Sequence, residues 1–152
     1  MPQNKPEAGS RRVRDVMTPN PATVSEKDSI KRVAEIMKRE DAGVVPVVDG
    51  RKIIGLITDR DIVVRLLAEG KDPSNARVGE AMSKQVRVVK EDQSVSEVLQ
   101  LMSREQIRRV PVTNSNNELV GIVSIGDIAS DSKETVKVGR AVEDISEAPP
   151  NN

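Results

Sequence analysis

The fold is decided by two short motifs that occur twice in the chain: Val45-Pro46-Val47 with Gly55-Leu56-Ile57-Thr58, and Val110-Pro111-Val112 with Gly121-Ile122-Val123-Ser124. The similarity extends outward from these motifs. When residues 13–49 are placed over residues 78–114 without a gap, 12 of the 37 positions are identical. Chance similarity does not keep spaced apolar positions in register over such a length, so the chain contains an internal repeat.

Each copy of the repeat predicts the same order of elements. A short extended segment (22–25 or 87–90) precedes an amphipathic helix (29–40 or 94–105), with Asp28 and Ser94 as the expected N-caps. Two strands follow at 44–48 and 53–57, or at 109–113 and 119–123, and a further helix begins near Asp59 or Ile125. The predicted fold class is α/β (α+β), with two β-α-β-β-α repeats packed as a pseudo-two-fold sandwich. A single unit of about 60 residues is marginal alone, and two copies bury each other's open faces.

The composition changes along the chain predict how it is divided. We expect a disordered tail over 1–10, the first repeat over 11–70, a linker over 71–77, the second repeat over 78–132, a C-terminal helix over 133–146 and a second disordered tail over 147–152. Pro46 and Pro111 lie within strand patterns but have no N–H to donate. Each is therefore expected to mark a sheet edge or a place where another group approaches.

The composition argues against several classes of function. Among the 152 residues there is no Cys, His, Trp, Tyr or Phe, and 24 basic residues balance 24 acidic ones. Cysteine or histidine catalysis and their metal sites are excluded, as are aromatic platforms for stacking nucleic-acid bases. The sequence has neither an apolar run of roughly 18 residues nor a secretory signal. We expect a soluble, cytoplasmic protein that is not an enzyme and has no metal, nucleic-acid or membrane partner.

The candidate chemistry lies where a strand leads into a helix. There a hydroxyl residue is followed three positions later by a carboxylate, as Thr58 with Asp61 and again as Ser124 with Asp127. Helix capping alone explains this spacing. Its recurrence at equivalent places, after a buried strand and at a helix start that favours phosphate, also indicates a ligand site. A carboxylate there can accept hydrogen bonds from the two hydroxyls of a ribose, so a ribose-phosphate compound fits.

The combination of Asp15-Val-Met-Thr-Pro19, the two Val-Pro-Val strands, Gly55-Leu-Ile-Thr-Asp-Arg-Asp61 and Gly121-Ile-Val-Ser-Ile-Gly-Asp127 resembles the CBS (cystathionine-β-synthase) domain, which occurs in tandem pairs. The resemblance covers roughly residues 13–130 and is closest to small bacterial proteins made of one CBS pair. It implies a regulatory module whose cleft between the repeats binds an adenosine nucleotide (AMP, ADP or ATP), or else NAD or S-adenosylmethionine. It also implies a homodimer, an unknown downstream protein and no cofactor beyond that ligand.

The resemblance also implies roles for individual residues. Asp61 and Asp127 would hold ribose, and Thr58 and Ser124 are the hydroxyls before them. The adenine wall would be Ala22, Thr23, Val45, Pro46 and Ile57 in one half, and Arg87, Val88, Val110, Pro111 and Val123 in the other. Arg108 and Arg109 would reach the phosphates at the Asp61 site, and Arg60 those at the other. With two arginines and Thr23, the Asp61 site is expected to bind more tightly.

Other interpretations remain open. The chain could be an interaction or stress-response protein whose pockets bind no nucleotide, in which case capping explains both Ser/Thr-x-x-Asp motifs. It could be a fragment of an enzyme, although no nucleophile with a partner base is present. Arg11, Arg12 and Arg14 form a basic cluster that could contact DNA but is better explained as a solvated flank. Arg108 and Arg109 could simply protect a strand edge.

Overall fold

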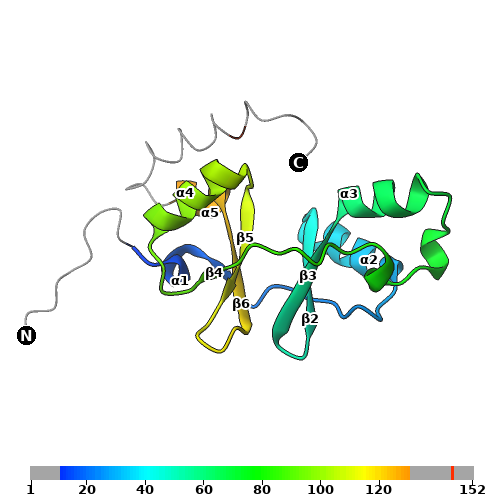
Figure 1. Cartoon of the computed structure of the whole chain (residues 1–152), viewed down its shortest axis with the longest axis horizontal. Helices are drawn as coiled ribbons and strands as arrows, with labels where there is room; N and C mark the ends of the chain where they lie inside the picture. Colours follow the sequence, from blue (N-terminus) through cyan, green and yellow to red (C-terminus); the bar gives the residue numbers. More distant parts are fainter. Residues whose placement is uncertain (1–10, 131–144, 146–152) are drawn as a thin grey trace, which may run out of the picture. The chain divides into compact units, whose positions relative to one another are not determined.

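The computed structural model describes residues 11–130 and Ile145 (Figure 1). Both expected tails lie outside the described residues, as does the expected helix 133–146 apart from Ile145, which is buried. The described chain is a mixed α/β structure, as predicted, and divides into two compact units. The Asp61 unit contains residues 21–86 and 117–119, and the Asp127 unit contains residues 11–20, 87–116 and 120–130.

The Asp127 unit is built on a four-stranded sheet. Its order is β1 (Thr18–Pro19), β6 (Leu119–Ser124), β5 (Arg109–Thr113) and β4 (Val89–Lys90). β1 runs antiparallel to β6, whereas β4 runs parallel to β5. The helices of this unit are α1 (Val13–Val16), α4 (Val95–Glu105) and α5 (Ile125–Ala129). Apolar residues from these helices and from β4, β5 and β6 form one aliphatic core, which includes Val13, Val98, Met102, Val110, Val112, Val123 and Ile128.

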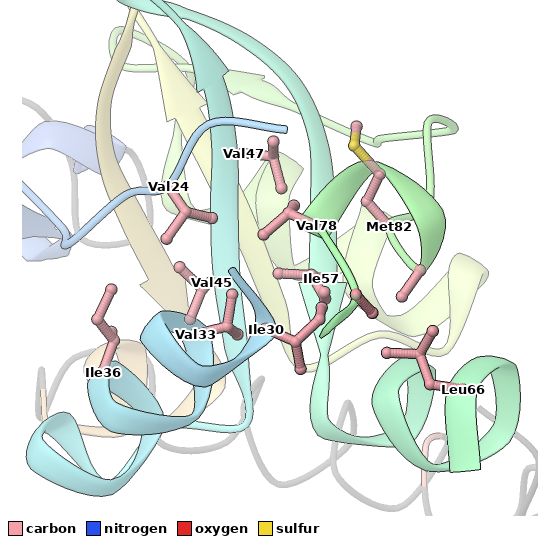
Figure 2. Close-up of a cluster of buried hydrophobic side chains, with 12 residues drawn as sticks. Val24, Ile30, Val33, Ile36, Val45, Val47, Ile57, Leu66, Val78 and Met82 are labelled. Carbon is pink, nitrogen blue, oxygen red and sulfur yellow. The ribbon is translucent and has the colours of Figure 1, made fainter. Parts of the chain in front are cut away.

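The Asp61 unit has the equivalent strands, β2 (Val44–Asp49) and β3 (Lys52–Thr58). Its helices are α2 (Ile30–Glu40) and α3 (Asp59–Ile62), which continues as a π-helical turn η1 (Val63–Leu67); two 3₁₀ turns follow, η2 (Pro73–Asn75) and η3 (Val78–Glu80). Single bridges extend the two strands on both sides: Val24 lies parallel to Val47, and Ser83 lies antiparallel to Leu56. Figure 2 shows the core of this unit, with Val33 of α2 and Val45 and Ile57 of the strands among the labelled side chains.

The segment that leads into each repeat completes the sheet of the other repeat. Thr18 and Pro19, near the start of the first repeat, pair with β6, and Ser83, near the start of the second, pairs with Leu56 of β3. A glycine accommodates each crossing: a Cβ on Gly121 would lie 2.9 Å from the Thr18 carbonyl oxygen, and a Cβ on Gly55 2.6 Å from that of Ser83. A methionine also lies over each glycine, Met17 over Gly121 and Met82 over Gly55. The compact units therefore differ from the sequence repeats at their starts.

One predicted helix cap is wrong and the other is confirmed. Ser29, not Asp28, is the N-cap of α2, because its Oγ accepts a hydrogen bond from the Arg32 N–H at 3.2 Å. The Asp28 carboxylate instead accepts from the Ser25 N–H at 2.8 Å in the preceding turn. Ser94 caps α4 as predicted, accepting from the Glu97 N–H at 3.1 Å.

Neither strand proline lies on a sheet edge. The Pro46 carbonyl accepts from the Val24 N–H at 3.1 Å, and the Val48 N–H donates to the Val24 carbonyl at 2.8 Å. Since the N and C=O of one residue point to the same side of a strand, the Pro46 nitrogen faces the segment before Val24 and has no proton to donate. Among the described residues the parallel pairing accordingly reaches Val24 but not Ala22.

Candidate functional site

Both Ser/Thr-x-x-Asp motifs form complete capping boxes. The Thr58 N–H donates to Asp61 Oδ2 at 2.9 Å, and the Asp61 N–H donates to Thr58 Oγ1 at 3.0 Å. The Ser124 N–H and the Asp127 N–H make the same two bonds, at 2.9 and 3.0 Å. These bonds satisfy N–H groups that a helix start otherwise leaves without a partner. The capping interpretation of both motifs is therefore correct.

Capping uses only one oxygen of each carboxylate. Asp61 Oδ1 lies 3.6 Å from Arg65 Nε, and the Asp61 side chain is 16% exposed. For Asp127, no residue in the described part of the chain forms a hydrogen bond or ion pair with Oδ1. An ionised carboxylate has acceptor sites on both oxygens, so each Oδ1 can still accept from a hydroxyl. Capping and ligand binding are thus compatible functions of the same side chain.

The start of each motif helix is fixed to the start of the neighbouring strand. The Asp59 N–H donates to the Gly43 carbonyl at 3.0 Å, and the Ile125 N–H donates to the Arg108 carbonyl at 2.9 Å. Arg108 is thereby held beside the Ser124 motif of its own unit. Arg108 and Arg109 are exposed, and neither side chain forms an ion pair with another described residue. Their reach toward Asp61 stays a prediction.

The other predicted arginines differ from each other in their surroundings. Arg60 is exposed and makes no ion pair within residues 11–130. Arg87 lies with its Nη2 3.5 Å from Glu105 Oε1, at the end of α4. Arg65, which the sequence analysis did not select, contacts Asp61 and also donates from Nη1 to the Met82 carbonyl at 3.1 Å. The sequence feature that could have identified Arg65 is its position four residues after Asp61 on one helical segment, a spacing that brings two side chains together.

Most of the predicted adenine wall is buried core. The exposed fractions of Val45, Ile57, Val110 and Val123 are at most 1%. The two strand prolines are buried as well, whereas Ala22, Thr23 and Val88 are half-buried. A ligand beside these strands would therefore contact the strand backbone and the half-buried residues at 22–23 and 88. The buried valines and isoleucine support the strands from the core.

One surface hollow of about 220 Å³ lies in the Asp61 unit. It is lined by Ala22, Thr23, Arg32, Glu35, Ile36 and Arg39. The hollow includes two predicted wall residues but neither Thr58 nor Asp61. Both of its arginines are near carboxylates, Arg32 with its Nε 3.7 Å from Asp28 and Arg39 with its Nε 3.3 Å from Glu40. We therefore do not assign the hollow to the Asp61 motif.

Within residues 11–130 and Ile145, no group of three or more His, Cys, Asp or Glu side chains is placed to hold a metal ion. Over the same residues, every helix is too short or too polar to cross a bilayer.

Comparison with known proteins identifies a family. A family model described as CBS domain matches residues 13–68 and 78–134. The CBS domain-containing protein YhcV of Bacillus subtilis (strain 168) is 40% identical over 134 residues, which cover 88% of this chain and 94% of YhcV.

Solved structures agree with this assignment. The crystal structure of Hypoxic Response Protein I with two coordinated zinc ions is 37% identical, with a TM-score of 0.72, and the match covers 79% of this chain and 98% of that one. The CBS domain pair of protein MJ0100, in complex with 5-methylthioadenosine and S-adenosyl-L-methionine, is 31% identical with a TM-score of 0.71; the match covers 82% of this chain and 98% of that one.

Proposed function

The chain belongs to the CBS domain family, and we propose that it is a regulatory module that binds an adenosine nucleotide of the AMP, ADP or ATP class in the cleft between its two repeats. The observation that carries the proposal is the second carboxylate oxygen of Asp61 and of Asp127, which capping leaves available at equivalent positions of both repeats. A related CBS pair in complex with two adenosine compounds, both without phosphate, supports an adenosine ligand.

The chemistry of the residues fits the parts of such a ligand. The ribose hydroxyls would donate to Oδ1 of Asp61 or Asp127, in charge-assisted hydrogen bonds that partial burial strengthens. The segment at Ala22 and Thr23, or the one at Arg87 and Val88, would border the adenine. The guanidinium groups of Arg60, Arg108 and Arg109, which no described carboxylate pairs with, would take the phosphates. A phosphate-free adenosine compound such as S-adenosylmethionine is the alternative that the MJ0100 complex favours, and NAD is another.

Regulation would follow from a change in populations. A ligand that contacts both repeats binds one arrangement of the pair more tightly than others, and it shifts the equilibrium by its difference in affinity. We infer that a homodimer presents this change to a downstream protein, without turnover of the ligand. The chain contains no His or Cys to act as base or thiolate nucleophile, which supports a role in binding.

The test must separate ligand binding from capping. Asp61→Ala removes both the capping oxygen and Oδ1, whereas Asp61→Asn keeps a carbonyl oxygen that can accept from the Thr58 N–H. Ser29→Ala is the control for the loss of a helix cap, because it removes the side chain that accepts from the Arg32 N–H at the start of α2.

We expect Asp61→Asn to stay close to wild type in stability but to lose affinity for AMP by at least about tenfold at its site, since one or two charge-assisted hydrogen bonds are lost. Ser29→Ala should lose about 1 kcal/mol of stability and keep its affinity. Calorimetric titration with circular dichroism measures both quantities. If Asp61→Asn and Asp61→Ala bind AMP as wild type does, Asp61 is a cap only.

A further inference from the structure

The two repeats differ in charge at two equivalent positions that lie side by side. Gly43 and Asp59 of the first repeat correspond to Arg108 and Ile125 of the second. The backbone is the same in both, because each pair is joined by an N–H to carbonyl hydrogen bond, at 3.0 Å for Asp59 to Gly43 and at 2.9 Å for Ile125 to Arg108. The side chains differ: the first repeat has a glycine and an aspartate at these two positions, and the second has an exposed arginine and an isoleucine.

The carboxylate of Asp59 has a defined position. One oxygen, Oδ1, accepts a hydrogen bond from the Arg60 N–H at 2.8 Å. The other, Oδ2, lies 3.1 Å from the point where a Cβ on residue 43 would be. The glycine therefore leaves the space that this carboxylate occupies, and any larger residue at position 43 would press against it.

The neighbourhoods of the two motifs consequently differ in charge. The first turn of α3 contains two carboxylates, Asp59 and Asp61, with the exposed Arg60 between them, and Arg65 Nε lies 3.6 Å from Asp61 Oδ1. The first turn of α5 contains one carboxylate, Asp127, and Arg108 lies beside it, directly before β5, which begins at Arg109. Like charges repel across several ångströms at a protein surface. The carboxylate of Asp59 therefore makes a phosphate group less favourable at the Asp61 motif than at the Asp127 motif.

We propose that Asp59 determines specificity at the Asp61 motif by disfavouring negative charge on the 5′ substituent of an adenosine ligand. This inference rests on the proposed function, which it refines. The Asp61 motif then prefers adenosine compounds whose 5′ group is neutral or positive. The Asp127 motif, with Arg108 beside it and an apolar Ile125 in place of the acid, accepts phosphate.

The experiment measures how affinity depends on ligand charge. The full chain carrying Asp127→Asn, which leaves the Asp61 motif as the main site, is titrated by calorimetry with adenosine, AMP, ADP and ATP. The same series is run after adding Asp59→Asn, which keeps the shape of the side chain and removes its charge. The readout is the ratio of the ATP and adenosine dissociation constants, which a general loss of stability does not change.

With Asp59 present we expect affinity to fall about threefold for each added phosphate charge at low salt, a modest effect because the carboxylate is exposed and screened. Asp59→Asn should lower the ATP-to-adenosine ratio about tenfold or more. The converse variant, Ile125→Asp in an Asp61→Asn background, should introduce the same dependence at the Asp127 motif.

The outcomes separate the two proposals. If the ligands bind but the ratio is the same with and without Asp59→Asn, the specificity role is wrong and the proposed function survives. If none of the four compounds binds to the wild-type chain, the proposed function fails and the specificity role fails with it. If Ile125→Asp strengthens ATP binding, the electrostatic explanation is contradicted.

Discussion

Replacing Gly55 by alanine should destabilise the Asp61 unit strongly. A Cβ at this position would lie 2.6 Å from the Ser83 carbonyl oxygen and would also overlap the end of the Met82 side chain. That carbonyl accepts from the Leu56 N–H at 3.0 Å, and the Ser83 N–H donates back to Leu56 at 2.8 Å. The methyl group therefore pushes against backbone that two hydrogen bonds hold in place.

The expected loss can be worked from these contacts. An extra methyl group in a well-packed region costs about 1–3 kcal/mol. Lengthening two backbone hydrogen bonds adds part of the roughly 0.5–1.5 kcal/mol that each contributes. We expect Gly55→Ala to lower the free energy of unfolding by about 2–4 kcal/mol. Gly121→Ala should behave similarly in the Asp127 unit, because its Cβ would lie 2.9 Å from the Thr18 carbonyl oxygen.

Gly126→Ala provides the matched control. It is a glycine of α5 whose Cβ would have Ser124 Oγ as its nearest neighbour, at 3.6 Å, an ordinary contact. Alanine there should be neutral or should stabilise by about 0.5–1 kcal/mol. Urea unfolding must be followed by far-ultraviolet circular dichroism, since the chain has no aromatic residue to fluoresce.

The steric argument is refuted if Gly55→Ala unfolds within about 0.5 kcal/mol of wild type, the usual range for a neutral surface substitution. Adding Met82→Ala to Gly55→Ala separates the two contacts. If Gly55→Ala costs as much stability in the Met82→Ala background as in the wild type, the clash is with the Ser83 backbone. If Gly55→Ala costs nothing in that background, the clash is with the methionine.

Three further predictions concern the charged groups. Hydrogen bonds from Gln93 and then Ser94 lower the pKa of Glu97 below its usual 4.5. The ionised Glu97 therefore stabilises the fold above that pH, and its contribution is lost as pH falls through the lowered folded-state pKa. Gln93→Ala should make the free energy of unfolding in urea less sensitive to acid in that range. Arg65→Ala removes the contact with Asp61 and the hydrogen bond to the Met82 carbonyl, and should lower stability by about 0.5–1.5 kcal/mol in the same assay, with Arg65→Lys intermediate. Affinity for AMP should change less than about twofold between pH 7 and 9 by calorimetry, because no histidine titrates near neutrality.

The four longer strands, β2, β3, β5 and β6, could be predicted to within about one residue from local sequence. β5 begins and ends where the alternation of residues 109–113 predicts, and β2 and β3 extend the predicted strands by one residue or so at their ends. Here the apolar pattern and the turn residues act together. The cap of α2 was missed by one position because Asp28 and Ser29 are both good N-cap residues, and the choice depends on the bond that Asp28 makes to Ser25.

The crossing of the leading segments could not be predicted in this way. Thr18 pairs with Ile122 far along the chain, and no local propensity identifies such a partner. The only trace in the sequence is the pairing of a methionine in each leading segment with a glycine in the opposite repeat, Met17 with Gly121 and Met82 with Gly55. That relation becomes visible only when the contacts are known.

The candidate site shows the same division. The repeat predicts that Asp61 and Asp127 occupy equivalent helix starts, and the structure confirms this. The sequence alone offered capping and ligand binding as competing explanations, and only the geometry shows that one carboxylate oxygen is enough for the cap. Asp59 was not selected, because its effect depends on a glycine sixteen residues earlier that lies beside it in space.

The central claim is tested most directly by titrating AMP into the wild-type chain and into the double variant Asp61→Asn, Asp127→Asn in a calorimeter. The account predicts saturable binding to the wild type and at least about tenfold weaker binding to the double variant, with both proteins folded by circular dichroism. Equal affinity in the two proteins would contradict it, as would the absence of binding and of any thermal shift with AMP, ADP, ATP, NAD and S-adenosylmethionine.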